Sequence, residues 1–331
     1  MLRGRHDRDI CARRSWSLSA MRQVSPQRLL QVLLGLVWLV DGVLQLQPFM
    51  FGRGFVTGVL LPSAQGNPTP VADSITAMAH FLEPHVAAWN ALFAVIQLAI
   101  GIGLLIRRTV RPALAVSFAW SLAVWWLGEG LGGLLTGSAS PLSGAPGAVS
   151  LYVLIGVLAW PRRGQRKDVG ATLSDALLGE AGARIAWALV WVGSAALLVQ
   201  PVNLAPGALH NTLEAAKAGQ PGWYAGLLSW AANALGYHGT LLTLGLAAEM
   251  LLVGAGIALG WKVPSLLGIA MLLAVLIWVF PEGLGGVLTG QGTDPNTGPL
   301  LALWAFAWWN WSRFEPEVLE MVVTAAVVEP A

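Results

Sequence analysis

The chain has 331 residues, of which 56% are hydrophobic and only 11% are charged. Soluble domains carry about 25% charged residues, so this composition excludes an ordinary soluble fold and indicates a membrane protein with several spans. The single cysteine, Cys11, excludes an intramolecular disulfide framework, a CxxC redox pair and an iron–sulfur cluster held by this chain alone.

Residues 1–28 are basic and contain no long apolar stretch, although they include seven arginines. A cleavable signal peptide needs an apolar core of about 7–15 residues followed by a small-residue cleavage site. We therefore expect residues 1–28 to form a cytoplasmic tail, and Met21 is an alternative start.

Eight segments are apolar enough to be interpreted as membrane spans, since a crossing helix needs about 20 apolar residues. They are Leu29–Gln47, Val86–Ile106, Pro112–Leu127, Gly147–Trp160, Ile185–Gln200, Gly239–Gly260, Val263–Phe280 and Gly298–Trp311. The fourth and eighth are short, so the Gly-rich loops before them are expected to dip into the bilayer, where protein or water must satisfy their polar groups. The expected fold class is an all-α integral membrane protein with eight transmembrane helices.

Basic residues alternate between the loops and predict the orientation. They cluster on one side of the expected membrane, at Arg107, Arg108, Arg111, Arg162, Arg163, Arg166, Lys167, Lys262 and Arg313. The positive-inside rule places these loops and both termini in the cytoplasm of a bacterial plasma membrane. We interpret the clusters as topology signals and expect no nucleic-acid partner.

One phrase occurs twice in the chain. Glu-Gly-Leu-Gly-Gly-Leu-Leu-Thr-Gly at residues 129–137 returns as Glu-Gly-Leu-Gly-Gly-Val-Leu-Thr-Gly at residues 282–290, an offset of 153 residues. The same offset relates Gln47-Pro48 to Gln200-Pro201 and His85 to His238. A constant offset over such a length indicates tandem duplication of a four-helix unit.

Four spans per unit is an even number, so both units enter the membrane the same way up. The repeats are then parallel and related by a pseudo-two-fold axis along the membrane normal. The expected domains are a first unit (29–161), a cytoplasmic linker (162–183), a second unit (184–313) and a cytoplasmic tail (314–331).

Each expected unit carries a glutamine, a histidine and a glutamate near the extracytoplasmic ends of its spans. These are Gln47, His85 and Glu129 in the first unit, and Gln200, His238 and Glu282 in the second. A carboxylate near an imidazole can relay protons, bind a metal or hold a polar headgroup. The alternative is ordinary helix-end chemistry at the interface, and one His with one Glu are too few ligands for a closed metal site.

The glycines after each glutamate permit positive φ and close backbone approach. They are Gly130, Gly132 and Gly133 in the first copy, and Gly283, Gly285 and Gly286 in the second. Two interpretations stay open: a fold-back turn at the membrane surface, or a small anion-binding nest of amides.

Two acids fall inside expected spans. Glu249 lies 11 residues after His238, roughly 16 Å into the membrane at a rise of about 1.5 Å per residue. A charge there costs a few kcal/mol, so Glu249 is expected to be protonated or to face a partner inside the bundle. Asp41 lies before Pro48 in the first span. Both are candidates for an internal proton or ligand site, or for a satisfied interhelical hydrogen bond.

The second span ends in Gly101-Ile-Gly-Leu-Leu-Ile-Arg-Arg-Thr-Val-Arg-Pro-Ala113, which resembles the DoxX-like family of bacterial four-helix membrane proteins. Glu249, the glycines after it, and Lys262-Val263-Pro264 look like a second, degraded copy. This resemblance implies four spans per unit and a link to redox complexes such as thiosulfate:quinone oxidoreductase. Gln97 stands near the position where the family often has an acid, and the repeated Glu-Gly-Leu-Gly-Gly loop is not typical of it.

We therefore expect a membrane subunit or accessory of a quinone-linked redox system, with an oxidoreductase partner subunit and paired sites at the extracytoplasmic face. No cofactor is evident from the residues, and quinone is the one that the resemblance suggests. The alternatives are a transporter or exporter of a small or lipidic solute and a non-catalytic membrane scaffold. Short amphipathic surface helices are expected at Val71–Glu83 and Ala208–Ala218, where a partner could dock.

Overall fold

The chain forms a helical bundle in a computed structural model that describes residues 26–161, 179–236 and 238–309. All regular secondary structure in these ranges is helical. Residues 1–25 of the expected tail at 1–28, most of the expected linker, residues 310–313 of the expected second unit and the whole expected tail at 314–331 lie outside the described residues.

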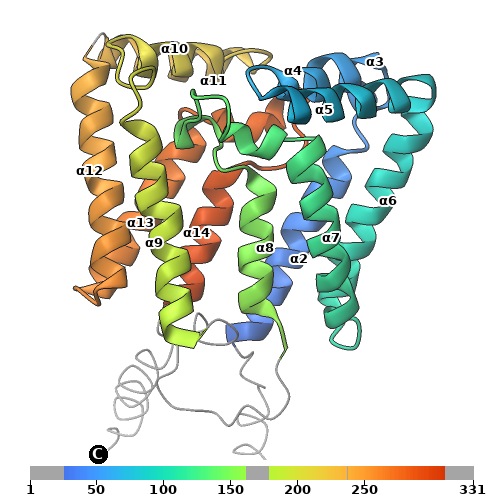
Figure 1. The fold of residues 1–331 in the computed structure, drawn as a ribbon, viewed down its shortest axis with the longest axis horizontal. Coiled ribbons are helices and arrows are strands. Elements are labelled where there is room, and N and C mark those ends of the chain that lie inside the picture. Colours follow the sequence, from blue (N-terminus) through green and yellow to red (C-terminus); the bar gives the residue numbers. More distant parts are fainter. Residues whose placement is uncertain (1–25, 162–178, 237, 310–331) are drawn as a thin grey trace, which may run out of the picture.

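One set of helices runs between the two ends of the bundle (Figure 1). They are α2 (Pro26–Leu44), α6 (Val86–Leu105), α7 (Val110–Leu127), α8 (Ala148–Ala159), α9 (Gly179–Leu198), α12 (Gly239–Ala258), α13 (Val263–Val279) and α14 (Thr297–Trp308). Helical stretches containing α2, α6, α7, α9 and α12 are each long and apolar enough to cross a membrane, and α13 with the bent segment after it makes a sixth. The short apolar helices α8 and α14 have 12 residues each.

Glycines allow the longest helices to pack closely in pairs. α2 packs mainly on α6, and α9 packs on α12. A Cβ added to Gly101 of α6 would come within 2.7 Å of the Leu39 side chain, and one on Gly254 of α12 would come within 2.9 Å of the Trp191 side chain. Small residues at such contacts are typical of helix pairs in membranes, where close backbone approach replaces the hydrophobic effect.

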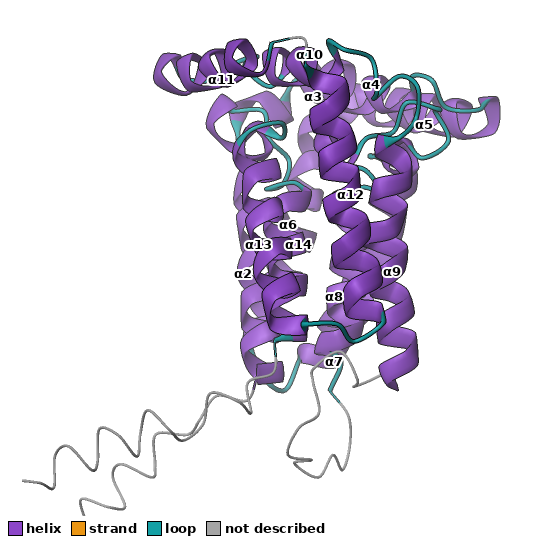
Figure 2. Ribbon diagram, turned by 90° about the vertical axis from the view of Figure 1, so that its left-hand side faces the viewer, coloured by secondary structure: helices purple, strands orange, loops and turns teal. Residues whose placement is uncertain are grey.

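A layer of short helices lies across one end of the bundle, which we name the cap end (Figures 1 and 2). It consists of α3 (Arg53–Phe55), α4 (Leu61–Ala64), α5 (Thr69–Leu82), α10 (Ala208–Ala215) and α11 (Gly222–Leu235). The helices α5 and α10 confirm the two surface helices expected from the sequence. The helix α11 was not expected, because its apolar residues had been assigned to no element.

The two halves of the bundle share one core. α8 of the first half packs against α14 of the second, and α2 also contacts α14. At the cap end, the side-chain amide of Gln47 donates to the carbonyl of Gly292 at 3.2 Å. In the other direction, the side-chain amide of Asn203 donates to the carbonyl of Ala139 at 2.9 Å. Each half therefore donates a side-chain hydrogen bond to a loop of the other half.

Candidate functional site

Both copies of Glu-Gly-Leu-Gly-Gly fold into a left-handed turn. Residues 130–133 all have φ between +54° and +68°, and residues 283–286 all have φ between +55° and +66°. Left-handed backbone costs an L-residue about 1–2 kcal/mol, so glycine at three of the four positions makes the turn accessible. Only Leu131 and Leu284 adopt it with a side chain. The sequence-based expectation of a fold-back turn is confirmed.

Steric crowding fixes the third residue of each turn. A Cβ on Gly132 would lie 2.0 Å from the carbonyl oxygen of Pro146, and one on Gly285 would lie 2.5 Å from the carbonyl carbon of Pro295. Each turn thus presses against the loop that leads into the next short helix, α8 or α14. This contact positions the glutamate that precedes the turn.

Each glutamate accepts hydrogen bonds from the first turn of that short helix. The Glu129 Oε1 atom accepts from the amide of Val149 at 3.3 Å. Glu282 accepts from the amide of Thr297 at 3.2 Å, from the amide of Gly298 at 2.9 Å and from the Thr297 hydroxyl. Carboxylates are favourable at helix N-termini because amides there lack intrahelical partners and the helix dipole is positive.

The two glutamates differ in how completely they are satisfied. Both carboxyl oxygens of Glu282 accept hydrogen bonds, and its side chain is buried with 7% exposure. The Glu129 Oε2 atom is also buried but has no hydrogen-bond partner among the described residues. The repeated glutamates are therefore alike in sequence and unlike in hydrogen bonding.

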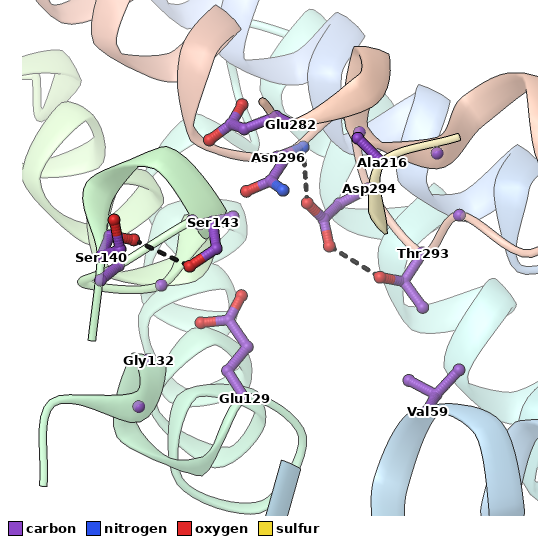
Figure 3. A pocket seen from close by; sticks show the side chains of 18 of the residues that line it. Val59, Glu129, Gly132, Ser140, Ser143, Ala216, Glu282, Thr293, Asp294 and Asn296 are labelled. Carbon is purple, nitrogen blue, oxygen red and sulfur yellow. Dashed lines mark hydrogen bonds between the residues drawn. The ribbon is translucent and has the colours of Figure 1, made fainter. Parts of the chain in front are cut away.

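A cavity of about 720 Å³ lies between the two turns at the cap end, and we name it the cap cavity. Its walls include Glu129, Glu282 and Asp294, which approach from three separate segments (Figure 3). The hydroxyl and amide side chains that line it are Thr136, Ser138, Ser140, Ser143, Gln220, Thr289, Gln291, Thr293 and Asn296. No described lining residue is basic. The cavity is thus polar and acidic, which disfavours the anion-binding interpretation of the glycine loops.

Burial and mutual repulsion change the protonation of these acids. Burial raises the pKa of Glu129 well above its usual value, and the nearby charge of Asp294 raises it further, while amides of the α8 N-terminus oppose the shift. Burial also raises the pKa of Asp294, against hydrogen bonds from Thr293 and Asn296. These bonds are 2.8 Å and 2.7 Å long (Figure 3). Burial also raises the pKa of Glu282, to about 7. Carboxyls with raised pKa values in a cavity are typical of proton-exchange sites.

A second cavity of about 300 Å³ lies in the first half of the chain. We name it the aromatic cavity, after its lining by Trp38, Phe55, Phe81, Trp89, Phe93 and Trp120. Glu129, Asp294 and Val59 line both cavities. Val59 belongs to η2 (Val56–Leu60), a π-helical segment, and such segments often occur at functional sites. Glu129 therefore stands in a wall shared by a polar and an apolar space.

Four polar side chains form the inner wall of the aromatic cavity. Trp38 and Asp41 lie three residues apart on α2, Gln45 follows directly after the end of that helix, and Gln97 lines the same cavity from α6. All are buried, with exposures between 1% and 7%. The Tyr152 hydroxyl donates to Asp41 Oδ2 at 2.6 Å, whereas Asp41 Oδ1 has no partner among the described residues.

Several sequence-predicted site residues lie elsewhere. His85 and His238 are exposed N-cap residues of α6 and α12 and line neither cavity, so the expected His–Glu pairs are not brought together. Sharing a depth was not enough, because each histidine also needs the right direction around its helix axis. Glu249 is exposed on α12, so its expected position in the bundle interior is wrong. Asp41, in contrast, is interior as expected.

The remaining predicted residues divide between cavity walls and packing. Gly132, Gly133, Gly285 and Gly286 line the cap cavity, whereas Gly130 and Gly283 are buried outside its lining. Gln47 makes the contact between the halves described above. The Gln200 Oε1 atom is buried without a partner among the described residues.

Sequence reasoning missed Asp294, Gln45 and Tyr152. Asp294 has no acidic counterpart at the repeat offset, where Pro141 stands, so the duplication gave no signal for it. Gln45 was detectable, since it lies one helical turn after Asp41 and α2 has few other polar residues. Among the described residues no group of three or more His, Cys, Asp and Glu is placed to hold a metal ion.

No family model, curated protein or solved structure matches this chain.

Proposed function

We propose that this chain is a duplicated, DoxX-like membrane protein with eight spans in two parallel four-helix units, and that its cap end faces the extracytoplasmic side. The matching left-handed turns, glutamate caps and helix pairs of the two halves support the duplication. Arg107, Arg108 and Lys262 lie at the end opposite the cap, which fits the positive-inside rule. On this arrangement α8 and α14 complete their spans with the Gly-rich segments before them.

In function, the protein is the membrane subunit or accessory of a quinone-linked redox system. One observation carries this proposal: Glu129 has a free carboxyl oxygen in the wall shared by the aromatic cavity and the cap cavity. The aromatic cavity suits the ring of a lipid-soluble carrier, and the cap cavity suits proton exchange with the outside. Electrons pass to or from an oxidoreductase partner subunit, as the DoxX-like resemblance implies.

The role of Glu129 depends on its surroundings. The Val149 amide holds one carboxyl oxygen in place, so the other points to a fixed position. The raised pKa of Glu129 favours the protonated form, so the carboxyl can act as a general acid toward a group in either cavity. Positioned general acids and bases contribute about 10²–10⁴-fold to rates, so a strong dependence on Glu129 is expected.

The experiment is quinone-linked oxidation in membranes that contain the wild type, Glu129→Gln or Glu249→Gln. The proposal expects at least a tenfold loss for Glu129→Gln, within the usual range for acid–base groups, and no loss for the exposed Glu249→Gln. Equal activity of all three proteins would rule out the proton role. Co-purification from native membranes would identify the partner.

A second function is favoured by the charge of the cap cavity. Three carboxyls without a basic lining residue attract cations, as expected of a transporter or exporter of a small cationic solute. Uptake of an organic cation into proteoliposomes, abolished by Asp294→Asn and indifferent to quinones, would support transport over the redox function.

A further inference from the structure

The aromatic cavity has a hydrogen-bonding pattern that specifies a ligand. Its buried polar atoms without partners among the described residues are Asp41 Oδ1, Gln45 Oε1, Gln97 Oε1, Glu129 Oε2 and the indole nitrogen of Trp38. Leaving a buried polar group unpaired costs about 1–3 kcal/mol. Five such atoms around one cavity make a polar group favourable there, either ordered water or the polar group of a ligand.

The identities of these atoms narrow the ligand's chemistry. One carboxyl oxygen of Asp41 accepts a hydrogen bond from Tyr152, and one carboxyl oxygen of Glu129 accepts one from Val149. The second oxygen of each carboxyl is therefore the acceptor that faces the cavity. The Trp38 indole N–H can only donate. A hydroxyl group satisfies both kinds of partner, whereas an ammonium group cannot accept from Trp38 and a carbonyl group cannot donate to Asp41.

The other walls require that the hydroxyl be attached to an apolar ring. Phe93 and Trp120 are in contact with ring centroids 5.3 Å apart, and Phe55 lies 6.3 Å from Phe93. Aromatic side chains of this kind favour a flat ring stacked or tilted against them. The volume of about 300 Å³ is at the lower limit of ligand cavities, enough for a ring but not for a long tail.

The cavity has a mouth through which a tail can leave. Most lining residues are buried or half-buried, but Phe81 of α5 and Ala123 of α7 are exposed. Phe81 packs against Trp89 of α6 at a centroid distance of 5.2 Å. The indole of Trp126 on α7 donates to Ser74 of α5 at 2.8 Å. The mouth therefore lies on the side of the bundle, among α5, α6 and α7, where apolar surface continues along the helices.

The second half does not preserve this site. At the repeat offset of 153 residues, Asp41 corresponds to Ser194, Gln45 to Leu198 and Gln97 to Met250. All three replacements are buried, with exposures of 7%, 0% and 1%. One short hydroxyl and two apolar side chains thus stand where the first half has a carboxyl and two amides.

We propose that the aromatic cavity binds one lipid-soluble phenol or hydroquinone per chain, with its hydroxyl between Trp38 and Asp41 and its tail leaving beside Phe81. This deepens the proposed function, because it assigns the reduced form of the carrier to the first half only. The site itself depends only on the cavity's walls.

Binding is tested on the purified full chain in nanodiscs, by equilibrium dialysis with three probes that share one ring and one short alkyl tail. The probes are the hydroquinone, the corresponding quinone and the dimethyl ether of the hydroquinone. The hydroquinone is expected to bind with a stoichiometry of one and at least tenfold more tightly than the ether, because sites built to bond a hydroxyl strongly reject analogues without it. Equal affinity of the ether, tighter binding of an alkylammonium with the same tail, or a stoichiometry of two would overturn the proposal.

Variants then locate the site. Gln97→Met, which installs the residue found at the second-half position, should weaken hydroquinone binding at least fivefold while keeping the side-chain volume. Ala123→Trp should fill the mouth and weaken hydroquinone binding at least tenfold, whereas Glu249→Gln should leave binding unchanged. Unchanged binding in both cavity variants, with thermal unfolding at the wild-type temperature, would place the ligand elsewhere.

The outcomes separate this inference from the proposed function. Hydroquinone binding as expected, with quinone-linked oxidation unaffected by Glu129→Gln, would retain the site and reject the redox function. Oxidation that depends on Glu129, with no hydroquinone binding in the aromatic cavity, would retain the redox function and reject the binding site.

Discussion

The different hydrogen bonding of Glu282 and Glu129 predicts different costs for the same substitution. Glu282→Gln keeps the shape of the side chain but replaces one acceptor oxygen with an NH₂ group and removes the charge. That group would face either the Gly298 amide or the Thr297 amide, both of which donate to Glu282 in the wild type. With the NH₂ group facing Thr297, that amide keeps its bond to Asn296 Oδ1 at 2.8 Å. The substitution then removes the bonds that the Thr297 amide and hydroxyl donate to Glu282, and it leaves the Gly298 bond in place.

The magnitude is set by the bonds lost. Burial raises the pKa of Glu282 to about 7, so folding does not stabilise the ionised form and loss of the charge adds no cost. A hydrogen bond contributes about 0.5–1.5 kcal/mol, so loss of the two bonds from Thr297 should lower the free energy of unfolding of Glu282→Gln by about 2 kcal/mol. The bond from the Val149 amide to Glu129 is 3.3 Å long, near the upper limit for N–H···O, so Glu129→Gln should cost about 1 kcal/mol or less.

Unfolding in mixed micelles, with an increasing fraction of denaturing detergent, measures both variants against wild type. Asp73→Asn changes an exposed acid of the cap helix α5, and as the control it should be neutral. A difference of about 1 kcal/mol corresponds to a roughly fivefold change in the folding equilibrium. Equal destabilisation by Glu129→Gln and Glu282→Gln would refute the assignment of Glu282 to structure and Glu129 to function.

Three further predictions concern the turns, the acids and the topology. Gly132→Ala should lower the free energy of unfolding by more than about 2 kcal/mol in thermal unfolding assays, because the new side chain adds left-handed strain and its Cβ would lie 2.0 Å from a carbonyl oxygen. Gly193→Ala in α9 has open space around its Cβ, so it should be neutral or stabilising by up to about 1 kcal/mol. Burial raises the folded-state pKa of Glu129 above 4.5 and that of Asp294 above 3.8, so the folded state holds these protons more tightly than the unfolded state does. The melting temperature should therefore fall as pH rises above these values. Glu129→Gln should reduce this pH dependence. In a Cys11→Ser background, Ser138→Cys should react with an impermeant thiol reagent added outside whole cells, and Arg108→Cys should not; the opposite pattern would invert the proposed orientation.

Helix positions were predictable from sequence because long apolar runs dominate them. All eight expected spans contain a helix, although α8 and α14 are shorter than a crossing length and their transmembrane status stays a prediction. The glycine turns were also predictable from local sequence, because three glycines in four residues allow left-handed backbone that few other sequences adopt.

The arrangement within the site was less accessible. Glu129 accepts from Val149, 20 residues later, whereas Glu282 accepts from Thr297, 15 residues later. The offset of 153 residues therefore does not relate the loops that follow the two turns. His85 and Glu249 were placed by depth alone, and depth leaves the direction around the helix axis undetermined. The aromatic cavity depends on residues from α2, α5, α6 and α7 that only packing brings together.

The reciprocal bonds from Gln47 to Gly292 and from Asn203 to Ala139 have a consequence for how such a protein could arise. Under the proposed duplication, a chain with one unit would present both a donor amide and an acceptor carbonyl that it could not join to each other. It would bury them only by pairing with a second copy. Fusion of the two units replaces that concentration-dependent encounter with an intramolecular one. Once fused, the two halves could diverge in sequence. If the halves associate through these contacts, a chain divided within residues 162–178 should still assemble from two coexpressed fragments.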